Sequence, residues 1–370
     1  MSNVLTQAFH QWANRPADER FTSLDQLHNH CSDVKNISRE TPNVTLRELG
    51  VIAGRPDLNS SDTEPFLIGP TGTTARFTHH SFGQFCRVVG APASYMRELP
   101  AELVAENMNH SLRTSDRVMT EDGARSGKLL FSKNGDLKLR AVTGDGYTRI
   151  WNSDITSRLL RFVQQYTDWQ PAPAAFDGSR GLYAGDKDVF AFLVNNNRPI
   201  FDSLPGGGLG RGFFVSNSEV GDASFRLTTF MYEYICGNHR VWGAKGVYDL
   251  RIPHVGNADD RAFRSLGVEL RKYTDAATGE DVRKIEACRK FKLGSTKDEV
   301  LDAAFGLRVI SRAKLEQAYD LAVAHSDWYG DPRSAWGLTG GLTEIARDLP
   351  NADERVVMDR AAGKIMQMAF

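Results

Sequence analysis

The spacing of apolar residues changes twice after residue 78. Between 78 and 108, apolar residues recur at helical intervals, as in Phe82, Phe85 and Val89, and this segment is predicted to be helical. The run KLLFSKNGDLKLRAVTG (128–144) instead alternates apolar and polar residues around Asn134-Gly135. This pattern favours a β-hairpin, because both turn positions need a positive φ. Beyond residue 256 the helical spacing returns.

Further strands follow the first hairpin. The segment TSRLLRFVQQY (156–166) has helical spacing, and Asn152, Ser153 or Asp154 is positioned to cap the helix. Two strands are expected around Gly185 in GLYAGDKDVFAFLVNN (181–196). The strand-like runs FFVSNSEVG and SFRLTTFMYEY then follow in the stretch 211–246, which is the expected centre of the architecture.

The strand SFRLTTFMYEY has two partly apolar faces. Phe225, Leu227, Thr229 and Met231 share one face, whereas the other carries Arg226, Thr228, Phe230 and Tyr232. Such a strand is either central in its sheet or has a second face that contacts a ligand.

The last third of the chain is predicted to be helical. A capping box at Thr296–Glu299 opens one long helix that ends near His325. Residues 1–65 are polar, with a short amphipathic helix near residues 5–13. The order predicts an α+β fold, a central antiparallel sheet of hairpins with helices before, within and after it. The regions expected are a mostly helical and loop part (1–109), the sheet core with one helix (110–256), and helices packed on the sheet (257–370).

Charge and cysteine content limit the classes of function. The 45 basic and 46 acidic side chains nearly cancel, so any affinity for nucleic acid must come from a local patch. The four cysteines are far apart, which favours free thiols in a reducing cytoplasm. Neither a signal pattern nor a membrane-length apolar run is present, so a cytoplasmic protein without a membrane partner is predicted.

An ordered set of short motifs resembles one family. They are a Tyr-x4-Asn-x-Asp pattern, an SNSEVG turn, a Cys-x-Asn knot and a C-terminal WGLTGGLTEIARDL followed by a helix. Together they resemble the phage- and plasmid-borne domain-of-unknown-function family 932, over about residues 110–370. The matching positions are Tyr147, Asn152, Asp154, Ser216, Asn217, Glu219, Gly221, Cys236, Asn238, Thr343 and the helix through Ala361. His239 departs from the pattern. The resemblance implies a mobile-element setting and no particular reaction.

Basic and aromatic residues alternate near the first motif. Arg140, Tyr147, Arg149 and Trp151 could hold single-stranded nucleic acid, with arginines on phosphates and rings on bases, or the rings could belong to the core. A second group continues along the later strand and its exit, comprising Arg226, Tyr232, Arg240, Trp242 and Lys245. The leading hypothesis is therefore a single-strand-binding or annealing factor in recombination or replication, without assigned catalytic residues. Homo-oligomerisation stays open.

Other interpretations stay open as well. Glu219 and Asp222, with Asp145 or Glu233, could bind Mg²⁺ in an enzyme acting on nucleic acid, although the SNSE turn is explained equally by turn chemistry. No other cofactor is predicted. Cys236 and His239 are half a zinc site, a buried thiol beside a bonded histidine, or a Cys-His nucleophile pair. His28 and His30 are two residues apart, which suits a strand face better than a helix, and no second pair of ligands follows at the spacing of a zinc finger. A structural protein whose basic patch meets an acidic partner is the third alternative.

Overall fold

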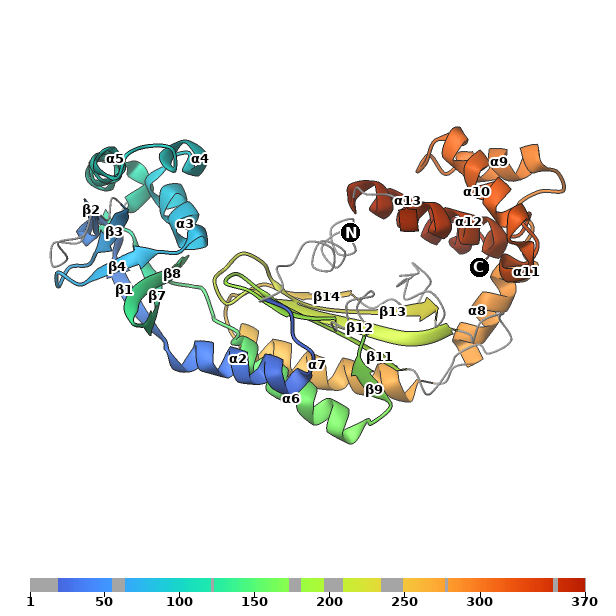
Figure 1. Cartoon of the computed structure of the whole chain (residues 1–370), viewed down its shortest axis with the longest axis horizontal. Coiled ribbons are helices and arrows are strands. Elements are labelled where there is room, and N and C mark those ends of the chain that lie inside the picture. The colour runs from blue at the N-terminus through green and yellow to red at the C-terminus, as the bar shows by residue number, and fades with distance from the viewer. Residues whose placement is uncertain are drawn as a thin grey trace.

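The computed structural model describes residues 19–54, 64–120, 123–172, 181–195, 209–233, 249–276, 279–348 and 352–369. Figure 1 shows two β-sheets with helices before, between and after their strands, which confirms the predicted α+β class. Within the described residues the strands form two six-stranded sheets and one two-stranded ribbon. The sequence pattern alone indicates a single antiparallel set, because it does not reveal which hairpins join the same sheet.

The first sheet has the order β1-β7-β8-β4-β3-β2. Helices pack on one of its faces around Phe85, Met108 and Leu139, which are fully buried. The predicted hairpin is confirmed, since β7 pairs antiparallel with β8. Its turn centres on Gly135 alone, which has a φ of +76°, whereas Asn134 pairs with Asp136 and has no positive φ. The elements of this part are β1 (Ser38–Thr45), η2 (Leu46–Glu48), β2 (Gly50–Ala53), β3 (Pro65–Ile68), β4 (Thr74–Phe77), α3 (His79–Val89), α4 (Ala93–Met96), α5 (Ala101–Thr114), η3 (Asp116–Val118), the ribbon β5 (Met119–Thr120) and β6 (Gly123–Ala124), β7 (Ser126–Asn134) and β8 (Asp136–Gly144).

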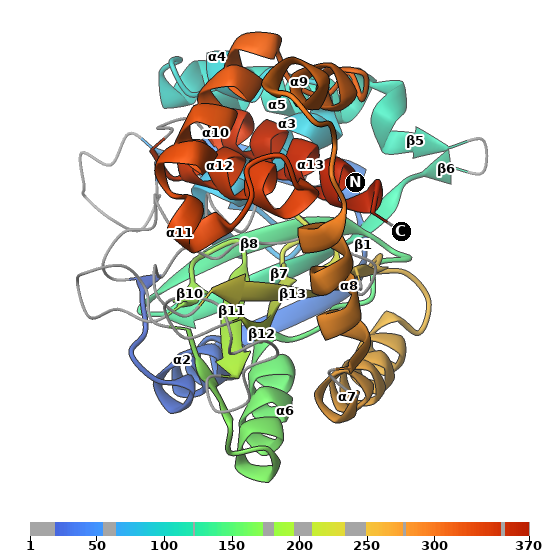
Figure 2. The ribbon, with the colours of Figure 1, turned by 90° about the vertical axis from the view of Figure 1, so that its right-hand side faces the viewer.

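The second sheet is antiparallel, with the order β10-β11-β12-β13-β14 and with β9 paired to β11. Helices α2, α6 and α7 cover one face, as Figures 1 and 2 show. The predicted alternation in β13 is confirmed, because Phe225 and Leu227 pack with these helices. The elements are α2 (Leu24–Asn36), α6 (Asn152–Gln165), β9 (Trp169–Pro171), β10 (Leu182–Ala184), β11 (Val189–Asn195), β12 (Leu209–Asn217), β13 (Phe225–Glu233), β14 (Asp249–Ile252) and α7 (Ala258–Asp275).

Helix α2 is absent from the sequence prediction, and the expected helix near residues 5–13 lies outside the described residues. The Ser23 hydroxyl caps α2 by accepting the N–H of Gln26. His28 and His30 therefore lie on a helix and not on a strand. The His28 ring bonds the Thr156 hydroxyl at 3.0 Å, which ties α2 to α6.

The C-terminal helices enclose a separate apolar core. The prediction of one long helix to about His325 is wrong, because the chain turns between α9 and α10. Arg308 has a φ of +52°, and the Ser311 hydroxyl accepts the N–H of Lys314 to start a new helix. The helices are α8 (Gly279–Lys290), α9 (Lys297–Phe305), α10 (Arg312–Ala324), α11 (Ser326–Tyr329), α12 (Ala335–Asp348) and α13 (Ala352–Gln367).

Candidate functional site

A bulge in β8 turns Arg140 towards the second sheet. In the β7–β8 ladder, Leu130 pairs with Ala141 and Phe131 pairs with Leu139, so Arg140 is the extra residue. A bulge of this kind re-aims the side chains on either side of it. Leu139 packs in the core of the first sheet, whereas Ala141 contacts the cluster containing Leu130 and Val220. The two sheets therefore meet beside Arg140.

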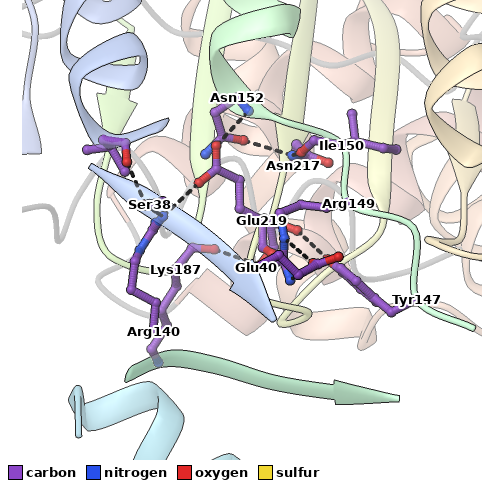
Figure 3. A network of polar contacts seen from close by, with 12 residues as sticks. Ser38, Glu40, Arg140, Tyr147, Arg149, Ile150, Asn152, Lys187, Asn217 and Glu219 are labelled. Atoms are coloured by element: carbon purple, nitrogen blue, oxygen red, sulfur yellow. Dashed lines mark hydrogen bonds and ion pairs between the residues drawn. The ribbon is translucent and has the colours of Figure 1, made fainter. Parts of the chain in front are cut away.

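Glu219 lies fully buried in the turn between β12 and β13, where its carboxylate joins three parts of the chain. One oxygen accepts a hydrogen bond from Arg140 Nη1 at 3.1 Å, and the other accepts the backbone N–H of Asn152 at 2.8 Å (Figure 3). The second bond satisfies an N–H at the start of helix α6, where a negative charge also favours the helix dipole.

The expected cap of helix α6 by Asn152, Ser153 or Asp154 is therefore wrong. The N-cap residue is Trp151, which makes no side-chain cap hydrogen bond. The Asn152 side chain is engaged elsewhere, since its Oδ1 accepts a bond from Asn217. Asp154 instead pairs with Lys35 of helix α2 at 2.8 Å.

Arg149 bridges the same two sheets. Its Nε and Nη2 donate to one carboxylate oxygen of Glu40 in β1 at 2.9 and 2.5 Å, and its Nη1 donates to the backbone carbonyl of Glu219. Arg140 and Arg149 are thus compensated by Glu219 and Glu40. Such compensation is required, because an uncompensated buried charge is strongly destabilising. We call these four residues, with Asn152 and Asn217, the inter-sheet network.

Asn217 completes the inter-sheet network. Its fully buried amide donates to the carbonyl of Ile150 and to Oδ1 of Asn152, both at 2.8 Å. The Tyr147 hydroxyl donates to the carbonyl of Ser218 at 2.9 Å. Gly221 has a φ of +81°, which favours glycine in the turn beside Tyr147. The two sequence motifs, far apart in the chain, therefore meet in space.

Aromatic rings surround this network. Tyr147 stacks on His254 with ring centres 4.9 Å apart, and the Arg149 guanidinium lies 5.2 Å from the centre of the Tyr147 ring. The centre of the Trp151 ring lies 5.8 Å from the Arg149 guanidinium and 5.5 Å from Lys35 Nζ. Burial lowers the pKa of His254 to about 4, and burial raises the pKa of Tyr147 above its ordinary value. The histidine is therefore neutral near pH 7.

Arg140 and Arg149, which the sequence pattern suggests as phosphate contacts, are buried and bonded inside the protein in this structure. Each is 8% exposed, and both guanidinium groups bond to acceptors inside the protein. Tyr147 and Trp151 are partly buried and take ring contacts from the protein's own arginine and lysine side chains. The first basic-aromatic group thus joins the sheets.

The second group lies on another surface. Arg226 points away from helices α2, α6 and α7, since its neighbours Phe225 and Leu227 face them. In the sheet, Ser216 pairs with Arg226 and Arg226 pairs with Arg251 of β14. Exposure rises along this row, from buried Phe190 through partly buried Ser216 and Arg226 to exposed Arg251. The edge at β14 therefore presents two arginines.

Several expected site residues, or their side chains, lie outside the described part of the chain. The backbone of Tyr232 belongs to β13, but its side chain is not described. Arg240, Trp242, Lys245, Cys236 and Asn238 lie outside the described residues. The sequence pattern does not predict a role for Glu40 or His254, because Glu40 lies in a polar segment and His254 follows a short edge strand.

The residues suggested for Mg²⁺ have separate partners. Glu219 bonds Arg140, Asp222 lies 3.7 Å from the His80 ring, and Asp145 bonds the Ser126 hydroxyl. In the described part of the chain, no group of three or more His, Cys, Asp or Glu side chains could hold a metal ion. Cys31, Cys86 and Cys288 are buried free thiols, as their spacing predicts.

Comparison with protein-family models, with curated proteins and with solved structures gave no match. Across the described residues, no helix has both the length and the apolar character needed to cross a membrane.

Proposed function

We propose that the protein binds single-stranded nucleic acid, as a strand-binding or annealing factor in the recombination or replication of a mobile element. The observation that carries the proposal is the cross-strand pair of Arg226 and Arg251 at the accessible edge of the second sheet. The proposed contact surface is this edge.

Electrostatics support this choice of surface. Two like charges directly opposite each other on adjacent strands destabilise a sheet. Within the described part of the chain, the Nε of Arg251 donates to the neutral hydroxyl of Ser224 at 3.2 Å. A phosphate group that binds at this edge would accept charge-assisted hydrogen bonds from the guanidinium groups.

The sequence of the connecting segment supports the same partner. It carries Arg240, Trp242 and Lys245 between the two strands that bear the arginine pair. A tryptophan that lies between cationic residues in the sequence suits a single-stranded nucleic acid, whose bases are unpaired. Stacking of a base on an aromatic ring contributes about 1–3 kcal/mol per base. Because the whole chain is nearly neutral, binding would depend on this local group of charges.

The test is a fluorescence anisotropy titration with a labelled single-stranded oligonucleotide at low salt. Arg226→Ala combined with Arg251→Ala is expected to weaken binding and to reduce the salt slope by about 1.4, which is about 0.7 for each lost phosphate contact. The control is Arg264→Ala, which removes an exposed arginine from α7 on the covered side of the sheet. Equal affinities for the double variant and the control would refute the proposed surface, and no saturable binding by the wild type would refute the function.

A further inference from the structure

A pocket of about 370 Å³ lies where the first sheet's helices meet two turns of the second sheet. Helix α3 contributes His79 and Arg87, and Arg97 follows α4. Lys187 comes from the β10–β11 turn and Asp222 from the β12–β13 turn. The inter-sheet network does not use these side chains, so the pocket is a separate feature of the junction.

The charges in this pocket are unbalanced. Among its described lining residues, Arg87, Arg97 and Lys187 are exposed cations, whereas Asp222 supplies the one carboxylate. Asp222 lies 3.7 Å from the His80 ring. Neither Arg87 nor Lys187 has an ion pair with any described residue, while Arg97 donates to the carbonyl of His79 at 2.9 Å. Three cations therefore converge on a pocket whose described lining contains a single carboxylate.

The pKa of His79, which lines the pocket, is consistent with a positive local potential. The pKa of His79 lies below its ordinary value of 6.5, chiefly because of the Arg97 charge, with burial and Lys187 acting in the same direction. A nearby cation disfavours the protonated imidazole in this way. The same potential favours an anion in the pocket.

The walls of the pocket are held together across the two sheets. His80 Nε2 lies 3.2 Å from the carbonyl of Val220, and the Gln84 amide donates to the same carbonyl at 2.6 Å. Gln84 also accepts the N–H of Val142 in β8 at 2.9 Å. Helix α3 is further fixed by a capping box between Thr78 and Ser81. The cations thus come from different elements that hydrogen bonds hold together. Because these elements are already fixed, the entropic cost of ordering the cations around a ligand is lower.

We propose that this pocket binds a phosphate group, carried by a small phosphorylated molecule or by a nucleic-acid strand. Guanidinium and ammonium groups are the side chains that recognise phosphate oxygens, the arginines through two N–H groups at once. The convergence of Arg87, Arg97 and Lys187 is the observation that assigns this ligand class. The proposal does not depend on the strand-binding surface at Arg226 and Arg251.

Isothermal titration calorimetry of the full chain with inorganic phosphate tests the site. Wild type is expected to bind saturably, and Arg87→Ala combined with Lys187→Ala is expected to weaken binding at least about tenfold, the loss typical of one charge-assisted contact. Both side chains are exposed, so the fold is expected to persist, which circular dichroism checks. Arg264→Ala is the matched control. The absence of saturable binding by the wild type, or equal affinity in the double variant, would overturn the proposal.

Two further arms distinguish the sources of the phosphate. If the ligand is a small molecule, a mononucleotide is expected to bind with the same affinity as an oligonucleotide. Arg87→Ala combined with Lys187→Ala is then expected to weaken the binding of these two ligands equally. If the ligand is a strand, only the oligonucleotide binds more tightly than inorganic phosphate.

Discussion

The carboxylate of Glu219 accepts the backbone N–H of Asn152 at 2.8 Å, so a residue in the β12–β13 turn caps helix α6. A cap usually comes from the residue just before the helix. Here that residue is Trp151, and the Asn152 side chain already bonds Asn217. Because Glu219 also bonds Arg140 of the first sheet, one carboxylate couples the start of α6 to both sheets.

Replacement of Glu219 by glutamine is expected to lower the free energy of unfolding by about 3–5 kcal/mol, the cost of leaving one member of a buried ion pair uncompensated. Arg140 would then stay buried beside a neutral amide. Urea unfolding measures the loss. The control Asp186→Asn removes an exposed carboxylate from the neighbouring β10–β11 turn and is expected to change stability by less than about 0.5 kcal/mol. Similar losses in the two variants would contradict the assigned role of Glu219.

A double-mutant cycle separates the ion pair from the cap. Arg140→Met in the Glu219→Gln background is expected to cost less than Arg140→Met alone, because the guanidinium no longer leaves an unpaired carboxylate. Any change in the cap bond to Asn152 caused by Glu219→Gln occurs in both the single and the double variant, so it cancels. Additive losses, within about 0.5 kcal/mol, would show that Arg140 and Glu219 do not interact.

Asn217 offers a second test of the inter-sheet network, one based on donor direction. Its amide nitrogen donates to two acceptors, the carbonyl of Ile150 and Oδ1 of Asn152. Asn217→Ala is expected to lower stability by about 1–3 kcal/mol, the penalty for unsatisfied buried groups. Asn217→Asp is expected to cost more than Asn217→Ala, because a buried carboxylate would face those two acceptors. Thermal unfolding ranks the variants, and an aspartate variant as stable as wild type would contradict this hydrogen-bond assignment.

The sequence pattern predicts what depends on neighbours in the chain. The Asn134-Gly135 hairpin and the alternation in β13 follow from turn chemistry and period. The position of Arg140 does not, because the bulge that turns it inward depends on the packing between β7 and β8. Spacing alone also fails to distinguish an exposed arginine from one that bonds Glu40 or Glu219, since both kinds of arginine occupy polar positions in the sequence pattern.

The same limit explains the errors at helix ends. A capping box predicts where α9 begins, but the end of α9 depends on Arg308, whose positive φ no local pattern demands. The motif residues Asn152, Asn217 and Glu219 meet in space although the two motifs are far apart in the chain. Their spacing could not reveal that they bond one another and not a ligand.

Stability is expected to depend on pH through His254. Burial lowers its pKa in the folded protein to about 4, below the ordinary value of 6.5 that applies when the chain unfolds. Between these values the unfolded chain takes up a proton that the folded protein does not, so stability is full above pH 6.5 and falls as the pH drops towards 4. The contribution of His254 to this loss is at most about 3 kcal/mol.

Comparison with His254→Phe isolates this titration. Phenylalanine keeps a ring against Tyr147 but carries no titratable group, although it loses the bond to the carbonyl of Thr148. Urea unfolding at several pH values is expected to show wild type losing stability relative to the variant as the pH falls from about 6.5 to about 4. His80, whose pKa is also lowered by burial, titrates in both proteins and cancels in the difference. A constant difference across this range would contradict the neutral state of His254.

Helix α12 is expected to tolerate no side chain at Gly341. A Cβ atom there would lie 1.9 Å from the carbonyl oxygen of Ala318 in α10, and the obstacle is backbone that cannot rotate away. Gly341→Ala is therefore expected to destabilise the protein by about 2 kcal/mol or more through overpacking, despite the better helix propensity of alanine. The matched control is Gly267→Ala in the exposed part of α7, where the nearest atom would be the mobile Arg271 Nη2 at 3.9 Å. This control is expected to raise stability by about 0.5–1 kcal/mol. Urea unfolding distinguishes the two, and a stabilising Gly341→Ala would mean that α10 and α12 approach less closely than they do here.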